Sequence, residues 1–339
     1  MQIRVVKYGH QNHHDLCEIT MTNDIGMQVK ILNYGATLED VVLPTMTGPR
    51  SVILSLNSPE EYAKERNFLG GTVGRVVGRI RNGLWQLVSQ KVQLPLNEGN
   101  NHIHGGIGTD MKVYSFQTKY GENTVETKFT LVDPNGENGY PGNLKIEVNY
   151  RLDNRNCIWY SISAITDKVT IFNPTNHVYF CLDGPDHTVE HASLQINSDT
   201  YLPLDKESLP FMGCKPVQGT VFDFRTPIPI GQVLRTADPE IVAEHGLNHP
   251  YILTGRQPAV ILIAADSKVS MIMTTQSPAV VVYTANHFNH QGVASNIGRY
   301  NGVALEAQCP PMESSDLTPI ILMPGEVFRT WTNWSFEFE

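Results

Sequence analysis

Several features that mark membrane, secreted or metal-binding proteins are missing from this sequence of 339 residues. No apolar run reaches the length of a transmembrane helix, and the N-terminal residues as far as His14 contain no signal-peptide core. The five cysteines are scattered, odd in number and never spaced as Cys-x-x-Cys, which argues against a disulfide framework and a structural zinc site. These absences predict a cytoplasmic protein without a membrane partner.

Basic residues are also in the minority, because 25 Lys and Arg residues stand against 34 Asp and Glu residues and give a formal net charge of −9. An acidic protein repels phosphate backbones and anionic lipid surfaces, so nucleic acid is a poor candidate partner. No dinucleotide-binding fingerprint is present either, and we expect no cofactor. A neutral small molecule suits this charge best.

Helix signals are scarce, and the best one runs from Ser58 to Arg66. There, Ser58 and Glu61 fit a capping box, with Pro59 at the first helical position. Strand patterns dominate instead, either alternating apolar and polar residues (125–131, 144–150 and 334–339) or mostly apolar runs that look buried on both faces (51–56, 259–263 and 279–284). We predict an all-β protein with very few short helices, built as one large antiparallel β-sandwich of two sheets and a single domain over residues 1–339.

A glycine-rich segment at residues 70–83 contains several arginines. Its glycines permit close approach to the backbone, and Arg75 or Arg79 can present a fork of donors to hydroxyls or carboxylates. From this segment alone, a loop with solvated arginines is the simpler interpretation.

Two histidines, His102 and His104, would share one face of an extended segment, as metal ligands on a strand do. A third ligand at a workable spacing is missing between Gly105 and Thr109, so we expect no metal site here. A hydrogen-bonding His104 in a ligand cleft is the more natural role, and a histidine satisfied within its loop is the structural alternative.

Another histidine, His177, follows the turn residue Pro174. If the chain is extended there, His177 and Tyr179 face one side while Val178 and Phe180 face the core. Histidine titrates near neutral pH and suits proton donation, although a lone strand histidine is more often structural.

A carboxylate, Glu306, lies in the very apolar segment 302–311, where Ala304 and Gln308 share its face. Burying an unpaired charge costs several kcal/mol, so Glu306 must be either paired or functional. The structural alternative is a Glu306–Arg79 ion pair, and the segment alone does not decide between the two.

Taken together, these segments resemble the aldose 1-epimerase (galactose mutarotase) family over nearly the whole chain. The motifs that carry the resemblance are residues 78–80, Asn97-Glu-Gly with His104-Gly-Gly, Asn173-Pro-Thr-Asn-His177 and Leu305-Glu-Ala-Gln308. The resemblance implies a β-supersandwich with an open carbohydrate cleft and an isomerase that interconverts the α and β anomers of a hexose such as glucose or galactose. It implies Glu306 as general base and His177 as general acid, with Arg79 and His104 holding and polarising the sugar.

One position departs from the family pattern, because Asn248 stands where the family usually has Asp. An amide can accept and donate hydrogen bonds but lacks the charge-assisted strength of a carboxylate. We therefore expect Asn248 to bind the sugar, the chemistry to survive and the sugar preference to shift. The sequence looks closer to a bacterial branch acting on a reducing disaccharide such as maltose.

Three other functions are open at this stage. A glycoside hydrolase needs two acidic groups beside the scissile bond, and only Glu306 has a motif context. A hexose-6-phosphate 1-epimerase is the runner-up, because Arg75 and Arg81 could contribute to a phosphate pocket. A non-catalytic carbohydrate-binding protein would have no need of both Glu306 and His177.

Aromatic side chains are candidates for a second sugar subsite, although aromatics in a sandwich are more often core. The three candidates are Trp85, Tyr179 and Phe288. We expect the protein to be a monomer or a homodimer.

Overall fold

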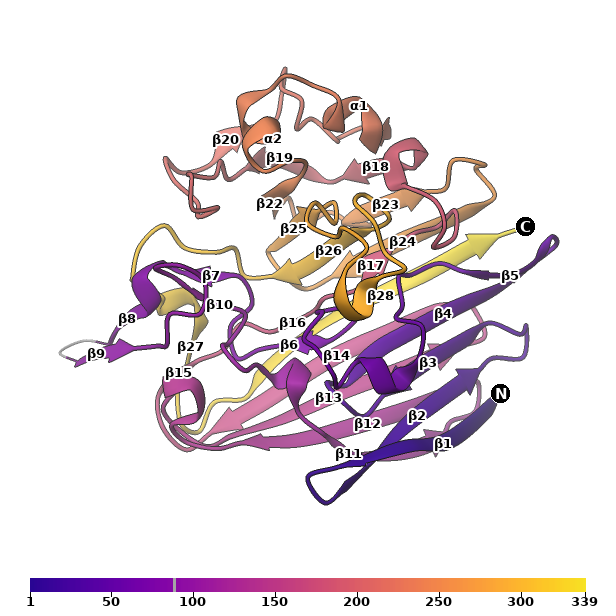
Figure 1. The fold of residues 1–339 in the computed structure, drawn as a ribbon, viewed down its shortest axis with the longest axis horizontal. Helices are drawn as coiled ribbons and strands as arrows, with labels where there is room; N and C mark the ends of the chain where they lie inside the picture. The colour runs from indigo at the N-terminus through magenta and orange to yellow at the C-terminus, as the bar shows by residue number, and fades with distance from the viewer. Residues whose placement is uncertain (88–89) are drawn as a thin grey trace.

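The computed structural model describes residues 1–87 and 90–339 and consists mainly of antiparallel strands (Figure 1), which confirms the all-β prediction. Most strands in the described part lie in three sheets of five, nine and six strands, where we predicted two. The additional sheet contains the segments 279–284 and 303–308, whose strands are buried almost throughout. Mostly apolar runs of this kind predict that a strand is buried on both faces. They do not predict which sheet the strand joins.

The N-terminal sheet has five strands in sequence order, each antiparallel to the next. They are β1 (Gln2–Gln11), β2 (His14–Thr22), β3 (Gln28–Leu32), β4 (Thr37–Thr45) and β5 (Gly48–Ser51). The predicted strand at 51–56 is wrong, because β5 ends at Ser51 and only an isolated bridge, from Ile53 to Phe180, follows. That bridge ties the end of this sheet to the strand beside the cleft.

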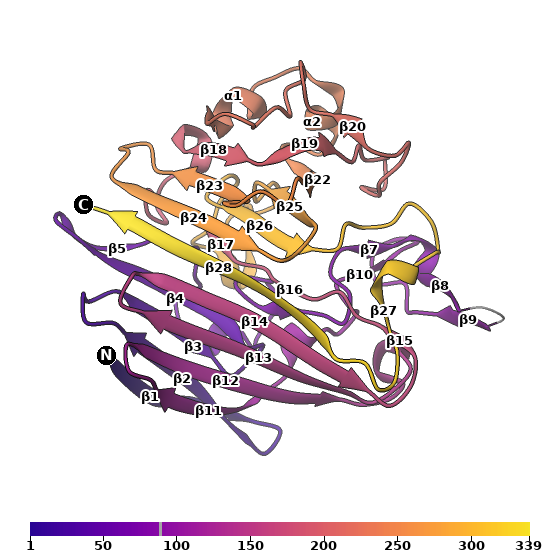
Figure 2. The ribbon, with the colours of Figure 1, turned by 180° about the vertical axis from the view of Figure 1, so that it is seen from behind.

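The nine-stranded sheet forms the second layer and is seen most clearly from behind (Figure 2). Alternating residues of β2, β12 and β13 meet in one hydrophobic core between the two layers, for example Ile19, Phe129 and Val148. In spatial order its strands are β11 (Ser115–Tyr120), β12 (Thr124–Asp133), β13 (Leu144–Asp153), β14 (Cys157–Thr166), β28 (Phe328–Phe338), β24 (Val269–Thr275), β23 (Val260–Ile263), β18 (Ser193–Ile196) and β21 (Ile228–Pro229).

The six-stranded sheet packs one face into the same core through Val280, Val303 and Leu305. Its opposite face carries polar side chains, and these define the cavity described below. In spatial order its strands are β17 (Tyr179–Phe180), β26 (Val303–Gln308), β25 (Ala279–Tyr283), β22 (Asn248–Leu253), β19 (Ser198–Tyr201) and β20 (Lys215–Pro216).

Four short strand pairs complete the β structure of the described residues. They are β6 (Thr72–Val73) with β16 (Thr175–Asn176), β7 (Arg79–Ile80) with β10 (His102–Ile103), β8 (Leu84–Leu87) with β9 (Gln90–Gln93), and β15 (Thr170–Ile171) with β27 (Ile321–Leu322). The first two pairs hold the segments around the predicted histidines.

Helix is confined to short pieces. The two α-helices of the described residues, α1 (Ile230–Leu234) and α2 (Pro239–Ala243), were not predicted, because one turn leaves almost no periodic signal. The helix predicted from Ser58 to Arg66 is only the 3₁₀ turn η1 (Pro59–Glu61), and Ser58 makes no side-chain cap. Further 3₁₀ turns are η2 (Arg81–Gly83), η3 (Thr109–Met111), η4 (Glu137–Gly139), η5 (Val189–His191), η6 (Gly292–Ala294) and η7 (Thr318–Ile320).

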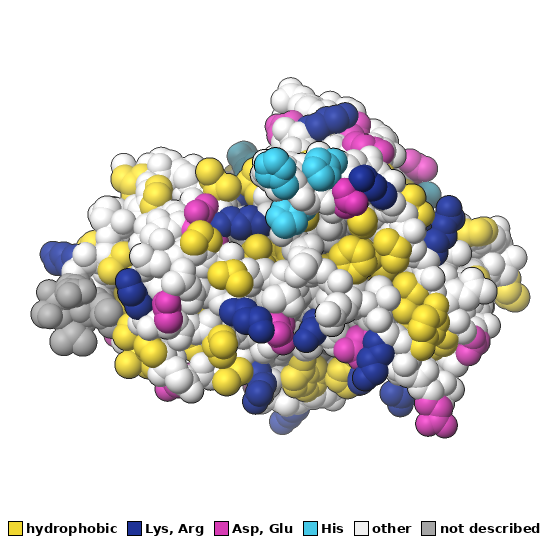
Figure 3. All heavy atoms as spheres, turned by 90° about the horizontal axis from the view of Figure 1, so that it is seen from below, with side chains coloured by type: hydrophobic (Ala, Val, Ile, Leu, Met, Phe, Trp, Pro, Cys, Tyr) yellow, Lys and Arg dark blue, Asp and Glu magenta, His cyan; other side chains and the backbone are white. Residues whose placement is uncertain are grey.

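One face of the molecule, seen from below in Figure 3, is mixed in charge. On the face shown in Figure 3, Lys and Arg side chains alternate with Asp and Glu side chains, and no broad region of one sign appears. Among the described residues, no helix is long and apolar enough to cross a bilayer.

Candidate active site

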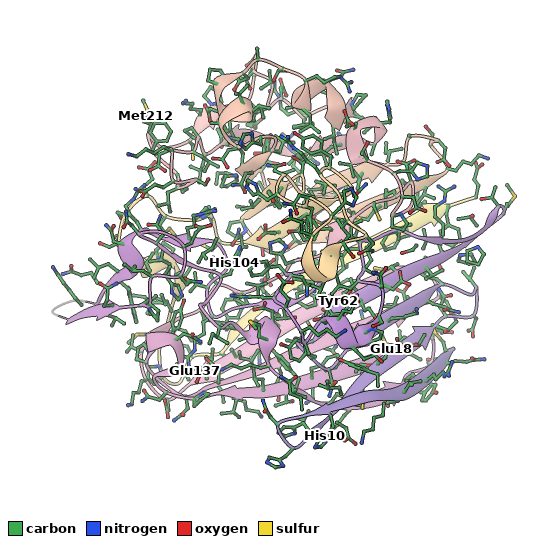
Figure 4. The ribbon with its side chains drawn as sticks, in the orientation of Figure 1. His10, Glu18, Tyr62, His104, Glu137 and Met212 are labelled. Atoms are coloured by element: carbon green, nitrogen blue, oxygen red, sulfur yellow. The ribbon has the colours of Figure 1, made fainter. Side chains whose placement is uncertain are left out.

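A cavity of about 780 Å³ lies over the polar face of the six-stranded sheet. Strands β17, β22, β25 and β26 form its floor, and the loops at 65–68, 97–104, 204–209 and 287–294 form its walls. All five predicted site residues line it: Arg79, His104, His177, Asn248 and Glu306. Figure 4 places His104 near the centre of the molecule, far from His10 and Met212 at its edges. The structure thus gathers residues from five separate segments of the chain.

Glu306 projects into this cavity from β26, a strand in which every residue is buried. Its neighbours Leu305 and Ala307 face the core, as the alternation of a strand requires. Burial raises the pKa of Glu306 to about 8, and the nearby positive charge of Arg79 opposes that rise. A carboxyl group with such a pKa both accepts and releases a proton near neutral pH.

His177 lies between β16 and β17, where the glycine-rich segment holds its backbone. The Gly70 N–H donates to the His177 carbonyl at 3.0 Å, and the His177 N–H donates to the Gly71 carbonyl at 2.9 Å. Gly70 has φ +64°, and a Cβ on it would stand 1.9 Å from the Leu38 carbonyl oxygen. Only glycine fits there, so this part of the motif positions His177 through the backbone.

The imidazole of His177 faces Glu306, with His177 Nε2 3.4 Å from Glu306 Oε1. Burial lowers the pKa of His177 to about 4, while Nδ1 is buried with no hydrogen-bond partner in the described part of the chain. Between these two pKa values the pair holds one proton, and burial favours the neutral arrangement with that proton on Glu306. The orientation of Val178 and Phe180 toward the core and of His177 and Tyr179 toward the cavity confirms the predicted alternation.

His104 stands beside this pair, with its ring centroid 5.4 Å from that of His177. The Gly78 N–H donates to His104 Nδ1 at 3.2 Å, so Nδ1 uses its lone pair and the ring proton is on Nε2. Burial lowers the pKa of His104 well below its usual value, which keeps the ring neutral. His104 is therefore a neutral hydrogen-bond donor at the cavity.

His102 does not share the face of His104, because His104 has φ +49° and the segment is not extended there. His102 lies in the core instead, where its ring nitrogens contact the Pro95 carbonyl and the Tyr140 hydroxyl. No cluster of three or more His, Cys, Asp or Glu side chains suited to a metal ion occurs among the described residues.

The three arginines of residues 70–83 take different partners. Arg79 donates to both carboxylate oxygens of Glu98, from Nε at 2.5 Å and from Nη2 at 2.7 Å, so the alternative of a direct Glu306–Arg79 pair is wrong. Arg75 is buried and paired with Asp133, outside the cavity. Arg81 pairs with Asp205. The structure therefore offers neither Arg75 nor Arg81 as a free cation for phosphate.

Two site residues were missed by sequence reasoning, Arg66 and Phe68. Arg66 donates to the buried carboxylate of Asp110 twice at 2.8 Å and to the His104 carbonyl at 2.7 Å. Its guanidinium lies 4.4 Å from the centre of the Phe68 ring, which in turn lies 4.8 Å from the His104 ring. The one available signal, Arg66 at the end of an expected helix, pointed to the wrong local structure.

The three aromatic candidates for a second sugar subsite do not all lie at the cavity. Trp85 is fully buried in a core cluster with Val76 and Leu94, so its assignment to a sugar subsite is wrong. Tyr179 and Phe288 line the cavity with their ring centroids 5.4 Å apart, edge to face. An aromatic wall of this kind suits the apolar face of a sugar ring.

Asn248, the first residue of β22, lines the cavity. Its side-chain amide donates from Nδ2 to Glu244 Oε2 at 2.8 Å. Asn248 therefore lies at the same cavity as the other four predicted residues, and its amide has a fixed partner.

Comparison with known proteins gives one consistent result. The family model described as aldose 1-epimerase matches residues 18–335. An aldose 1-epimerase of Escherichia coli (strain K12) is 33% identical over 332 residues, 94% of each chain, and a galactose mutarotase of Homo sapiens is 32% identical over 323 residues, 91% of each. The crystal structure of a galactose 1-epimerase from Lactobacillus acidophilus superposes with a TM-score of 0.95 at 51% identity, covering 99% of both chains.

Proposed function

Because this chain belongs to the aldose 1-epimerase family and interconverts the α and β anomers of aldoses, we propose that Glu306 and His177 carry out the two proton transfers of that reaction. The observation that carries the proposal is the 3.4 Å separation of His177 Nε2 from Glu306 Oε1 at the floor of one cavity. Opening a hemiacetal requires one proton to leave the C1 hydroxyl and another to reach the ring oxygen. One acceptor and one donor side by side suffice for both steps.

The mechanism runs from the ring-closed sugar to the open aldehyde and back. Glu306 takes the proton of the C1 hydroxyl, a C1=O double bond forms, and the C1–O5 bond breaks. His177 gives its proton to O5, so that no charge is left on the open chain. Rotation about C1–C2 turns the other carbonyl face to the O5 hydroxyl, and the reverse transfers close the ring as the other anomer. Each positioned proton transfer contributes about 10²- to 10⁴-fold in rate.

These proton transfers require the pair in its charged arrangement, with a carboxylate at Glu306 and an imidazolium at His177. The total proton count is the same as in the neutral arrangement, so both exist in the same pH range. Arg79 favours the charged form of Glu306, because its positive charge opposes the rise of that carboxyl pKa. His104, as a neutral Nε2–H donor, stabilises negative charge on a sugar oxygen.

The roles of Glu306 and His177 are tested by polarimetry of freshly dissolved α-galactose with Glu306→Gln and His177→Asn. We expect each substitution to lower kcat by about 10²- to 10⁴-fold, while the thermal unfolding midpoint stays close to that of the unmodified protein. Near-normal turnover in either folded variant would overturn the assignment of that residue.

A reducing disaccharide such as maltose is a second candidate substrate, favoured by the size of the cavity. Its volume of about 780 Å³ extends from Glu306 past Tyr179 to Phe288, and ligand pockets span about 300–1,000 Å³. We expect Phe288→Ala to raise KM for β-maltose more than KM for α-glucose. An equal effect on both sugars would leave Phe288 outside any second subsite.

We also propose that the chain acts in the cytoplasm as a single domain, in monomeric or homodimeric form. Support for one domain comes from the core that joins residues of β2, β13 and β28. One cooperative unfolding transition is expected in urea, and two separate transitions would contradict the single domain.

A further inference from the structure

Glu244 is buried beside the cavity without lining it, and it holds two residues that do. Asn248 Nδ2 donates to Glu244 Oε2 at 2.8 Å, and the Ser208 hydroxyl contacts both carboxylate oxygens, at 2.9 and 3.0 Å. Only 7% of Glu244 is exposed, whereas Ser208 and Asn248 both face the cavity. The carboxylate therefore acts on the cavity through these two neighbours.

The backbone fixes this arrangement from both sides. Glu244 is the C-cap residue directly after α2, and its carbonyl accepts a hydrogen bond from Asn286 Nδ2 at 2.9 Å. Asn286 Nδ2 also donates to the Leu247 carbonyl at 2.9 Å, immediately before Asn248. Asn248 then enters β22 opposite Tyr283 of β25. The distance between Glu244 and Asn248 is thus set by sheet and helix, not by a mobile loop.

A carboxylate accepts hydrogen bonds and donates none, so its neighbour must turn the NH₂ end of its amide toward it. The Oδ1 atom of Asn248 is consequently held on the other side of the amide. No donor among the described residues occupies this oxygen. It is available as an acceptor for a hydroxyl group of a ligand.

We propose that Glu244 is a specificity-determining positioning residue, which fixes Asn248 as an acceptor for one sugar hydroxyl. The proposal rests on the proposed function of the cavity. It also explains the amide at position 248, since an aspartate there would place two carboxylates in contact. The carboxylate in this part of the site is thus Glu244, which contacts Asn248 and does not itself line the cavity.

A charge-swap cycle tests the pair with Asn248→Asp, Glu244→Gln and the double substitution. Asn248→Asp alone sets two carboxylates together, and we expect KM for the best of galactose, glucose and maltose to rise about 10-fold or more, equivalent to about 1.4 kcal/mol. In the double variant, the amide of the new glutamine can donate to the new aspartate. We expect KM to return to within a few-fold of the original value, with kcat unchanged throughout.

A deoxy and fluoro series of the best sugar identifies the hydroxyl involved. A deoxy or fluoro group cannot donate to Asn248 Oδ1, so one position in the series should lose affinity in the unmodified protein. We expect Glu244→Gln to reduce the penalty at that same position, because the amide is free to turn. A merely structural role of Glu244 would lower stability without changing which position is penalised.

Ser208→Ala is the milder matched variant, because it removes one donor to Glu244 and keeps the hydrogen bond between Asn248 and Glu244. We expect a KM increase of a few-fold and no change in kcat. The proposal is overturned if the double variant is no better than Asn248→Asp alone, or if Asn248→Asp binds sugar normally.

Calorimetric binding of galactose, glucose and maltose separates this proposal from the assignment of Glu306 and His177. Sugar binding that follows the charge-swap pattern in a protein without turnover supports the role of Glu244 and refutes the catalytic assignment. Absence of any sugar binding refutes both.

Discussion

Arg75–Asp133 and His177–Glu306 are both buried pairs of ionisable side chains, yet their surroundings differ. Arg75 donates to Asp133 Oδ2 at 2.6 Å, to the Thr170 hydroxyl and to several backbone carbonyls, and Lys112 also contacts Asp133. The pair at the cavity has far fewer partners. Nδ1 of His177 is buried without one, and so is Oε1 of the adjacent Gln308, as far as the described residues extend.

This difference separates a structural charge from a reactive one. Burial of a charge is costly, and the Arg75 cluster offsets the cost with nearly every available hydrogen bond. His177 and Glu306 have few hydrogen bonds to offset the cost of burying a charge. As a result, the pKa of the Glu306 carboxyl is about 8 and that of the neighbouring His177 imidazole is about 4. Strong shifts of this origin in a cleft are typical of groups that move protons.

The largest expected effect comes from Arg75→Met, which leaves Asp133 buried without its main partner. We expect the free energy of unfolding to fall by about 3–5 kcal/mol, measured by urea denaturation at 25 °C. The folded fraction should keep its kcat, since Arg75 lies outside the cavity. A large loss of kcat at full stability would remove the distinction between the two pairs.

The next effect concerns the pH dependence of stability. The pKa of Glu306 is about 8 in the folded protein against an ordinary value of 4.5, so its stabilising contribution is complete below pH 4.5 and is lost as pH rises through 8. The pKa of His177 is lowered from its ordinary value of 6.5 to about 4, so its contribution to stability has the opposite pH dependence. That contribution is complete above pH 6.5 and is lost as the pH falls through about 4. The range from pH 6.5 to 9 therefore separates the contribution of Glu306 from that of His177.

Within that range we expect the unmodified protein to lose about 2 kcal/mol of unfolding free energy relative to Glu306→Gln. Urea denaturation of both proteins at pH 6.5 and pH 9 measures the difference. Parallel pH profiles would mean that Glu306 is ionised at neutral pH as an exposed carboxylate is.

Much of this arrangement follows from the sequence, for reasons that differ between residues. Strand alternation was enough to turn His177 toward the cavity and Val178 into the core, since a period of two leaves no other choice. The partners of Arg75 and Arg79 could not be predicted from the sequence. Asp133 and Glu98 come from elsewhere in the chain, and spacing within a motif carries no information about such contacts.

Local geometry explains the remaining errors. The i, i+2 spacing of His102 and His104 indicated a shared face, but the left-handed backbone of His104 sends the two rings to different places. Trp85 was a candidate for the cleft by residue type alone, and its strand β8 buries it elsewhere.

The smallest expected effect is a shift of the pH–rate profile. With one proton on the pair between its two pKa values, kcat/KM should fall below about pH 4 and above about pH 8. Arg79 lowers the pKa of Glu306, so Arg79→Met should move the alkaline limb to higher pH. Glu98→Gln, which keeps Arg79, is the control and should move that limb in the opposite direction or not at all.

The most direct test is a ¹³C NMR titration of the Glu306 side-chain carboxyl, assigned by comparison with Glu306→Gln. A carboxyl buried beside a neutral imidazole should titrate with a midpoint near pH 8 in the sugar-free protein. A midpoint near 4.5 would show an ordinary ionised carboxylate, and the difference from the Arg75 cluster would then have no consequence for proton transfer.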